Sequence, residues 1–457
     1  MTPPLPPTRE NTIALIAASI PLAPDAAHIR AQLTRAALNW DDALYLADGH
    51  GITPLLYQLW RRLDVLALIP TDAQTRMAQA YRDNATRNAD ARREFRTLIE
   101  MMEHTRVETI VMKGLPLLDQ LYADPAERVL YDFDLLARDK SAAQLGYDAL
   151  LAAGFTPVPT KTGAVVHKHL PSVWRLNGFV RRGYLFDVAQ PRPVEMHLQL
   201  WDTQWRGLDL LPLPDVWQNC QRVNVDDSSV RVLSLHDTCV HLCVHLATHL
   251  VEREARVGQA IDIARLLTKR SSEINWERVI AASEHARVTR FVYLALRAVN
   301  TLTGAPLPPQ NILDALRAKT PARLRAWVEQ NGARDVLSMD FRDTDLSRAY
   351  ALTFAATQSW QERARVLRFA LFPPMDTLQA EYGGQGLWLY ARHLEGRGRV
   401  YFNALRQRRT DVSFRAEREI SFAKTEISAM DTSHPAVQKL PLSNLSEGTE
   451  NANLCES

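Results

Sequence analysis

Apolar residues recur every three or four positions over much of the chain, which is the spacing of one helix face. The pattern runs from about residue 24 to residue 105. Its longest stretch, 72–104, is expected to form one long amphipathic helix or a pair of helices. Asp41 is expected to cap an earlier helix, which Gly49 or Gly51 would end. The N-terminal part of the chain is therefore predicted to be helical.

The pattern changes in the middle of the chain to short runs of β-branched and aromatic residues, which are typical of strands. We expect strands at 107–112, 129–137, 164–170, 184–189 and 194–201. Helices are expected between them, at 115–123 and at 141–155, the second capped by Ser141 and ended at Gly154. Such alternation of strands and helices predicts an α/β or α+β region.

After residue 230 the helical spacing returns. Helices are expected at 234–250, 260–270, 276–286 and 290–304, and further helices to about residue 410. The end of the chain is polar and poor in aromatic residues, which favours disorder. The predicted organisation is a flexible proline-rich leader at 1–23, a helical region at 24–105, an α/β core at 106–205, a helical domain at 206–410 and a polar tail at 411–457.

Length, charge and cysteine content limit the classes of protein to which this chain can belong. A chain of 457 residues is long enough for two or three domains. Its net charge of +2 favours neither a nucleic acid nor an acidic surface as partner. Four cysteines make no disulfide framework, and neither a signal peptide nor a membrane-spanning stretch is expected. These features predict a cytoplasmic protein.

The run "VLYDFDLLA" carries two acids inside an apolar strand. Asp132 and Asp134 are two residues apart, so their side chains are expected on one face, with Leu130 and Leu136. Two neighbouring carboxylates raise each other's pKa unless a cation neutralises them. Mg²⁺ prefers oxygen ligands and binds one or two carboxylates together with substrate phosphates. The pair therefore indicates a magnesium site.

A third carboxylate would complete a site for two metal ions. Glu195 in "VEMHLQLW" lies on a polar side with His197 and Gln199, while Val194 and Met196 alternate with it. Asp187 in "YLFDVA" is the competing residue, but it has no polar companions two residues away. The pattern favours Glu195.

These segments together resemble a known family. The order is "TIVMKG", "LPLLDQLYAD", an arginine four residues before "DFDLL", and "VEMH". It is similar to the bacterial uncharacterised nucleotidyltransferases, which have the polymerase-β-like nucleotidyltransferase superfold. The segments "LSLHDTCVHLCVHLATH" and "LFPPMDTLQAEYG" also look like parts of this family. The resemblance extends over residues ~24 to ~400.

The resemblance implies an α+β fold, with a small mixed β-sheet flanked by N- and C-terminal helical regions. It implies that Asp132 and Asp134 bind Mg²⁺ or Mn²⁺, and that Glu195 binds the metal or accepts a proton. It also implies that Lys113, Gly114 and Arg128 bind the triphosphate. The turn reads "KGLP" without a hydroxyl after the glycine, and seventeen residues separate Gly114 from Asp132. Both features depart from compact members of the superfold.

The implied reaction transfers a nucleoside monophosphate from a nucleoside triphosphate to an acceptor hydroxyl and releases pyrophosphate. The acceptor is a small molecule, a peptide or a protein, and a nucleic acid is not expected. The alternative is a catalytically inactive protein of the same fold that binds a nucleotide or a partner. A purely helical scaffold conflicts with the strand zone at 107–201.

Three histidines share one face of a predicted helix. His241, His245 and His249 are four residues apart, a spacing at which pairs of histidines bind zinc. Three histidines over two turns do not reach one ion, so packing or a position at the nucleotide cleft is favoured. Asp262 is expected to orient one of them. Arg128 has a second interpretation, as a loop partner of Asp124 or Glu127.

Overall fold

The computed structural model describes residues 7–35, 37–159, 167–175, 184–338 and 346–398. The chain divides into a unit of residues 1–401 and a second unit of residues 402–457. All described residues belong to the first unit. The predicted polar tail at 411–457 lies outside them.

The strands form one mixed sheet of seven strands in the order β3-β4-β5-β2-β1-β7-β6. Their bounds are β1 Thr109–Val111, β2 Phe133–Ala137, β3 Thr156–Pro157, β4 Val173–Trp174, β5 Val194–His197, β6 Gln221–Val225 and β7 Ser228–Val232. Strand β2 pairs parallel with β5 and antiparallel with β1, which pairs parallel with β7. All five residues of β2 are buried, as expected for a central strand covered on both faces.

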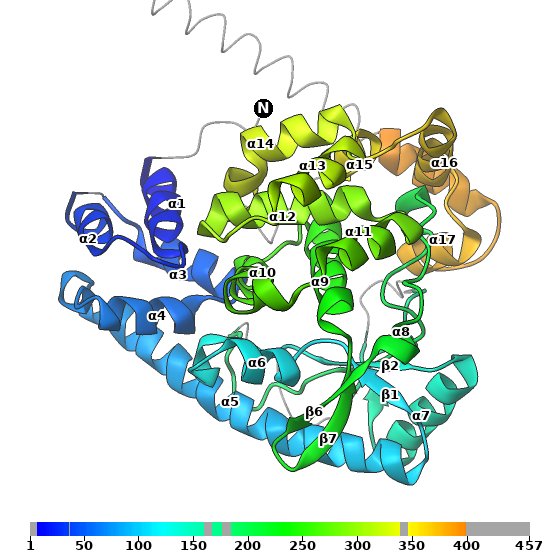
Figure 1. Cartoon of the computed structure of the whole chain (residues 1–457), viewed down its shortest axis with the longest axis horizontal. Coiled ribbons are helices and arrows are strands. Elements are labelled where there is room, and N and C mark those ends of the chain that lie inside the picture. The colour runs from blue at the N-terminus through cyan, green and yellow to red at the C-terminus, as the bar shows by residue number, and fades with distance from the viewer. Residues whose placement is uncertain (1–6, 36, 160–166, 176–183, 339–345, 399–457) are drawn as a thin grey trace, which may run out of the picture. The chain divides into compact units, whose positions relative to one another are not determined.

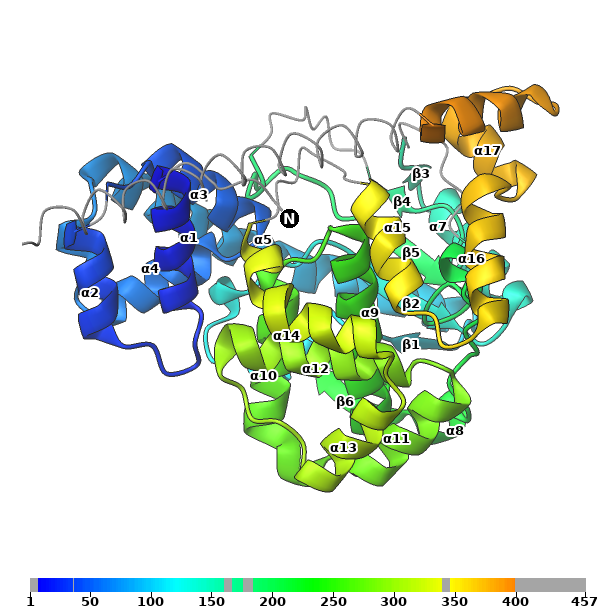
Figure 2. The same ribbon diagram turned by 90° about the horizontal axis from the view of Figure 1, so that it is seen from above.

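Seventeen α-helices are assigned within the described part of the chain (Figures 1 and 2). Those before and within the sheet are α1 Pro7–Ser19, α2 Ala26–Arg35, α3 Trp40–Gly49, α4 Thr53–Arg62, α5 Thr71–His104, α6 Leu115–Leu121, α7 Lys140–Ala152 and α8 Val216–Asn219. Those after it are α9 Leu235–Glu252, α10 Val257–Arg270, α11 Trp276–His285, α12 Thr289–Thr303, α13 Gln310–Ala318, α14 Ala322–Leu337, α15 Leu346–Ala355, α16 Trp360–Leu371 and α17 Met375–Tyr382.

The sheet has an apolar face and a partly polar face. On the apolar face, Phe133 of β2 lies 6.0 Å from Phe95 of α5 between ring centroids. On the same face Met196 of β5 packs beside Gly146 of α7, where an added Cβ would lie 2.7 Å from the methionine methyl carbon. Because side chains alternate along a strand, Asp134 and Glu195 point to the opposite face. Helices α5 and α7 thus cover one side and leave the acids facing the other.

One continuous hydrophobic core joins the helical regions to the sheet. It includes Leu15 of α1, Ile110 of β1, Leu246 of α9 and Phe291 of α12, each fully buried. Figure 1 shows α5 running along the sheet from α1–α4 towards α7, while α9 connects the sheet to the later helices. The core therefore holds α9 and α10 in place above the polar face of the sheet.

The predicted fold class, α+β with a small mixed sheet between helical regions, is confirmed. The stretch 72–104 is one helix, α5, and not a pair. Gly154, expected to end the helix at 141–155, has a positive φ of 85° two residues beyond α7. The later predicted helices correspond to α9, α10, α11 and α12. Long segments with clear periodicity are the ones that the pattern locates well.

Two predicted strands are wrong in whole or in large part, and the others are longer than the strands observed. Strand β2 begins at Phe133 rather than at residue 129, which leaves Asp132 just before it, and β5 ends at His197 rather than at residue 201. Residues 184–189 form turns, because the Asp187 carboxylate accepts a hydrogen bond from the Ala189 amide and the Asp187 carbonyl accepts one from Gln190. In 164–170, the described residues 167–170 contain one isolated bridge, between His169 and His197. Residues 164–166 lie outside the described ranges. Local turn hydrogen bonds replace the ladder that the apolar pattern suggested.

The hairpin of β6 and β7 was not predicted. It turns at Asp226, which has a positive φ of 50°. It adds strands to the sheet beyond 106–205, the range predicted for the core. Two expected helix caps also differ: Asn39 caps α3 in place of Asp41, and Asp139 caps α7 in place of Ser141.

The expected flexible leader at 1–23 is wrong for residues 7–19, which form α1. Leu15, Ile16 and Ile20 are buried, so this segment contributes apolar side chains to the core. The run "TIALIAASIPLA" is therefore part of the fold. Among the described residues, no helix is both long and apolar enough to cross a membrane.

Candidate active site

The register between β2 and β5 brings two acids together. Asp134 lies directly opposite Glu195 in the parallel ladder, so both side chains project from the same face. Asp134 is buried, while Glu195 and Asp132 are partly exposed. Asp134 thus lies beside the predicted third acid on the polar face of the sheet, while Asp132 lies just before β2 and is more exposed.

His197, two residues after Glu195, links the two acids. Its Nε2 lies 3.0 Å from the Asp134 Oδ1 and 3.3 Å from the Glu195 Oε2. Burial opposes a charged imidazole, but the hydrogen bonds to both carboxylates raise the pKa of His197 above its ordinary value. Burial likewise opposes a charged Glu195, yet His197 outweighs it and lowers the pKa of Glu195 to about 2.

Two further side chains hold the other sides of the Glu195 carboxylate. The Ser172 hydroxyl donates to Oε1 at 3.0 Å, and the His169 Nε2 lies 3.3 Å from Oε2. Burial lowers the pKa of His169. Glu195 is therefore oriented by three neighbours. By contrast, the Asp187 carboxylate accepts a hydrogen bond from the Ala189 amide in its own turn. The structure therefore brings Glu195 rather than Asp187 beside Asp134.

Lys113, at the end of β1, provides the positive charge next to the acidic pair. Its Nζ lies 3.2 Å from the Asp134 Oδ2 and 4.0 Å from the Asp132 Oδ1. Burial raises the pKa of Asp134, but Lys113 and His197 outweigh it and hold that pKa well below its usual range. Burial and the charge of Asp134 raise the pKa of Asp132 to about 7. The two acids thus differ: Asp134 keeps its charge, and Asp132 takes up a proton first.

The donor atoms of this cluster suit a divalent cation. Ligand atoms of Asp134, Glu195 and His197 all lie within 4.8 Å of one another. The buried Asp134 Oδ2 has no hydrogen-bond partner among the described residues, although the Lys113 ammonium is near it. Carboxylate oxygens are the ligands that Mg²⁺ prefers, whereas the His197 Nε2 donates its proton to the two acids and holds them in place. Asp132, the third predicted ligand with Asp134 and Glu195, lies outside this group, and its ligand role stays a prediction.

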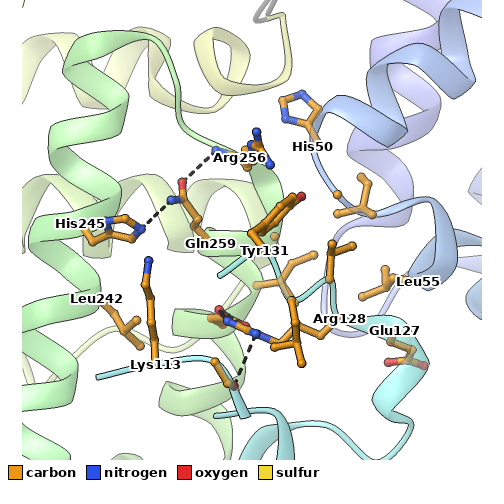
Figure 3. Close-up of a pocket in the computed structure, with 18 of the residues that line it drawn as sticks. His50, Leu55, Lys113, Glu127, Arg128, Tyr131, Leu242, His245, Arg256 and Gln259 are labelled. Atoms are coloured by element: carbon orange, nitrogen blue, oxygen red, sulfur yellow. Dashed lines mark hydrogen bonds and ion pairs between the residues drawn. The ribbon is translucent and has the colours of Figure 1, made fainter. Parts of the chain in front are cut away.

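A cavity of about 430 Å³ opens beside the acidic cluster (Figure 3). Lys113, Gly114, Arg128 and Asp132 line it, so the predicted triphosphate-binding residues surround one space together with one acid of the pair. Gly114 has a φ of 80°, and a Cβ added there would meet only the Asp132 carbonyl oxygen within 4 Å. Because the backbone is bare at this point, a ligand can approach it closely.

Arg128 pairs with Asp262, which corrects two expectations. Its Nε and Nη2 each lie 2.9 Å from a carboxylate oxygen of Asp262, and its Nη1 lies 3.5 Å from the Gly114 carbonyl oxygen. Asp262 also accepts a hydrogen bond from the Tyr122 hydroxyl at 2.6 Å. Asp262 therefore orients an arginine rather than a histidine. Arg128 is held towards Gly114 rather than paired with its loop neighbours Asp124 or Glu127.

The histidine row of α9, His241, His245 and His249, lies near Lys113. Burial, followed by the charge of Lys113, lowers the pKa of His241 and of His249 to about 3. The same two causes hold the pKa of His245 well below its usual range. His245 and His249 line the cavity, and the Gln259 Nε2 lies 3.0 Å from one ring nitrogen of each. All three rings are neutral, and His245 and His249 form a neutral wall of the cavity.

Sequence reasoning missed three features of this site. The place of His197 on the polar side of its strand was recognised from the i+2 spacing, but its contacts with Asp134 and Glu195 were not. The partnership of Lys113 with the acids, and the side chains of Arg256 and Tyr131 in the cavity wall, depend on tertiary contacts. The spacing along the chain carries no sign of those contacts.

Comparison with known families yields one finding. The profile of the family described as "Uncharacterised nucleotidyltransferase" matches residues 36–304, more than half of the chain and all strands of the sheet. Curated proteins and solved structures give no significant match. The acidic cluster, the Gly114 turn and the cavity all lie inside the matched range. The chain belongs to the uncharacterised nucleotidyltransferase family.

Proposed function

We propose that the protein is a nucleotidyltransferase that depends on Mg²⁺ or Mn²⁺ and transfers a nucleoside monophosphate from a nucleoside triphosphate to an acceptor hydroxyl. In this reaction the acceptor oxygen forms a bond to the α-phosphorus, the bond to the β-phosphate oxygen breaks, and pyrophosphate leaves. The observation that carries the proposal is the acidic cluster of Asp134, Glu195 and His197 beside the cavity that Asp132 and Lys113 line.

Asp132, Asp134 and Glu195 are the residues that would hold the metal. When bound, a divalent cation supplies neutralisation of phosphate charge and activation of the attacking hydroxyl. The low pKa of Glu195 keeps its carboxylate ionised at neutral pH, which suits a ligand. His197 holds Asp134 and Glu195 at a fixed separation through its Nε2, so the ligand oxygens are oriented before substrate arrives.

Lys113, Gly114 and Arg128 are the proposed triphosphate-binding residues. The Arg128 guanidinium is fixed by Asp262, which leaves its Nη1 directed to the Gly114 turn. Lys113 reaches the cavity from the end of β1. Since a guanidinium offers five donors in one plane, Arg128 retains donors for phosphate oxygens after Asp262 has taken two.

The proposed setting is the cytoplasm, and the proposed acceptor is a small molecule, a peptide or a protein. Among the described cysteines, Cys220, Cys239 and Cys243 are free thiols, which supports a reducing compartment.

A second candidate function is binding of a nucleotide or a partner without catalysis. The contact of Lys113 with both aspartates favours it, because an internal ammonium can neutralise the pair. The two functions differ in turnover: both predict nucleotide binding, and only the first predicts release of pyrophosphate.

The test is product analysis. The protein is incubated with the four common nucleoside triphosphates, Mg²⁺ and a cell metabolite extract, with Asp134→Asn as the matched control. Mass spectrometry is expected to find a nucleoside monophosphate adduct in the wild-type sample, with pyrophosphate released in equal amount. Nucleotide binding without pyrophosphate above the level of the variant supports the second candidate and contradicts the first.

A further inference from the structure

The cavity wall contains three lysine or arginine side chains, and they differ in their partners. Lys113 lies beside Asp132 and Asp134, and Arg128 is paired with Asp262. Arg256 forms no ion pair within the described ranges. Its guanidinium carbon instead lies 4.4 Å from the centroid of the Tyr131 ring (Figure 3). Arg256 is thus the one cation of this wall without a described carboxylate at ion-pair distance, although Glu254 lines the same cavity.

Arg265 of α10 provides a matched comparison for Arg256, which caps the start of the same helix. Arg265 lies 4.0 Å above the Tyr122 ring in the same kind of contact, but its Nη2 also lies 2.6 Å from the Glu127 Oε2. A ring face attracts a guanidinium without cancelling its charge, whereas a carboxylate cancels it. Arg265 is therefore a structural cation, and Arg256 keeps a net charge at the cavity.

Gln259 fixes the position of Arg256 at the start of α10. Its Oε1 accepts a hydrogen bond from the Arg256 backbone amide at 2.9 Å. Since Oε1 is the acceptor, the amide nitrogen donates to the His245 Nε2 and to the His249 Nδ1. One side chain thus links Arg256 to the neutral histidines of α9. These rings contribute no competing negative or positive charge next to Arg256.

We infer that the end of the cavity formed by Tyr131 and Arg256 is an anion-binding subsite that takes a phosphate group of a substrate. The inference rests on the proposed function, because that function supplies phosphate-bearing ligands to this cavity. Such a phosphate group has two sources with the same chemistry. One is the polyphosphate of the nucleotide, and the other is a phosphate on the acceptor. Arg256 supplies the charge and the hydrogen bonds, Tyr131 supports the guanidinium, and Gln259 is a positioning residue.

The test measures binding rather than turnover. ATP, inorganic tripolyphosphate and adenosine are titrated calorimetrically into wild type, Arg256→Met, Arg256→Lys and Arg265→Met. Methionine keeps much of the side-chain length without the charge, and lysine keeps the charge. Arg265→Met is the matched control, because Glu127 keeps Arg62 as a partner at 3.1 Å. Melting temperatures report whether each variant remains folded.

The expected result is a loss of roughly tenfold to a hundredfold in tripolyphosphate affinity for Arg256→Met, a smaller loss for Arg256→Lys, and none for Arg265→Met. A parallel loss for ATP assigns the anion to the nucleotide, while unchanged ATP affinity assigns it to the acceptor. Adenosine affinity is expected to stay the same.

Two outcomes overturn the inference. One is unchanged tripolyphosphate affinity in Arg256→Met. The other is an equal loss in Arg256→Met and Arg265→Met, which indicates a general structural effect. Because no turnover is measured, failure of the proposed transfer reaction does not affect this test. A protein without transferase activity that loses tripolyphosphate binding in Arg256→Met still has the anion subsite.

Discussion

The acidic cluster on the sheet and the histidine row on α9 are both largely buried, polar and close to Lys113, yet they differ in charge. In the cluster, the pKa values of Asp134 and Glu195 are lowered and that of His197 is raised, so all three favour their charged forms. In the row, His241 and His249 have pKa values of about 3 and stay neutral.

Partners, rather than burial, account for this difference. Asp134 lies between a lysine and a histidine, so opposite charges alternate within hydrogen-bond distance. The rings of the row neighbour other rings and the amide of Gln259, and the charge that affects them most is the repelling ammonium of Lys113. A buried charge persists only where a partner offsets its desolvation. The charged region is the one suited to metal and phosphate chemistry.

The largest expected effect is on transfer activity and comes from removing the charge of Asp134. Asp134→Asn removes the charge that faces both Lys113 and His197. We expect transfer activity to fall on the order of a thousandfold, because a metal ligand and the orientation of its neighbours are lost together. Steady-state rates measure this, with circular dichroism to verify folding. Activity within tenfold of wild type would exclude a catalytic role for Asp134.

The next largest effect is expected at the third acid of the site, for which Glu195 and Asp187 were the two candidates. Glu195→Gln is expected to lower kcat roughly a hundredfold or more while the protein stays folded, since the amide keeps the shape and removes the charge. Asp187→Asn serves as the control and should have a much smaller effect, because its carboxylate contacts its own turn. Equal rates for Glu195→Gln and wild type would instead move the role away from Glu195.

A partly buried acid at the end of α9, Glu252, allows the comparison to be tested through pH. Glu252 accepts a hydrogen bond from the Trp205 indole at 2.7 Å and forms no ion pair in the described part of the chain. Burial, the largest cause, raises its pKa from 4.5 to about 7. A folded-state pKa above the unfolded value means that stability is lost as pH rises from 4.5 through 7.

Glu252→Gln should therefore remove that loss. We expect the variant to melt a few degrees higher than wild type at pH 8 and at about the same temperature at pH 4.5, a difference of roughly 3 kcal/mol at most. Differential scanning calorimetry at both pH values measures it. A variant that melts lower than wild type at pH 8 would show that the charged carboxylate is stabilising.

The smallest expected effect concerns metal at the histidine row. Its rings are hydrogen-bonded through Gln259, and we expect no structural zinc there. Dialysis against a strong zinc chelator should leave the melting temperature unchanged. A drop that zinc restores and that His245→Asn abolishes would contradict the neutral-wall interpretation.

The sequence was a good guide where one local pattern dominated. Periodicity located α5 and α9, and strand alternation put Asp134 and Glu195 on one face. It was a poor guide where short-range hydrogen bonds compete with the pattern, as at Asp187, whose turn replaces a predicted strand. The partner of Arg128 lies 134 positions away at Asp262, so no local rule could identify it.

The most direct test of the central claim is the effect of metal on nucleotide binding. ATP is titrated calorimetrically with and without Mg²⁺ into wild type and into the double variant Asp132→Asn, Asp134→Asn. We predict that Mg²⁺ tightens binding to wild type by about tenfold or more and leaves the variant unchanged, because the aspartates hold the cation beside the phosphates. Equal ATP affinity with and without Mg²⁺ in both proteins would contradict the account.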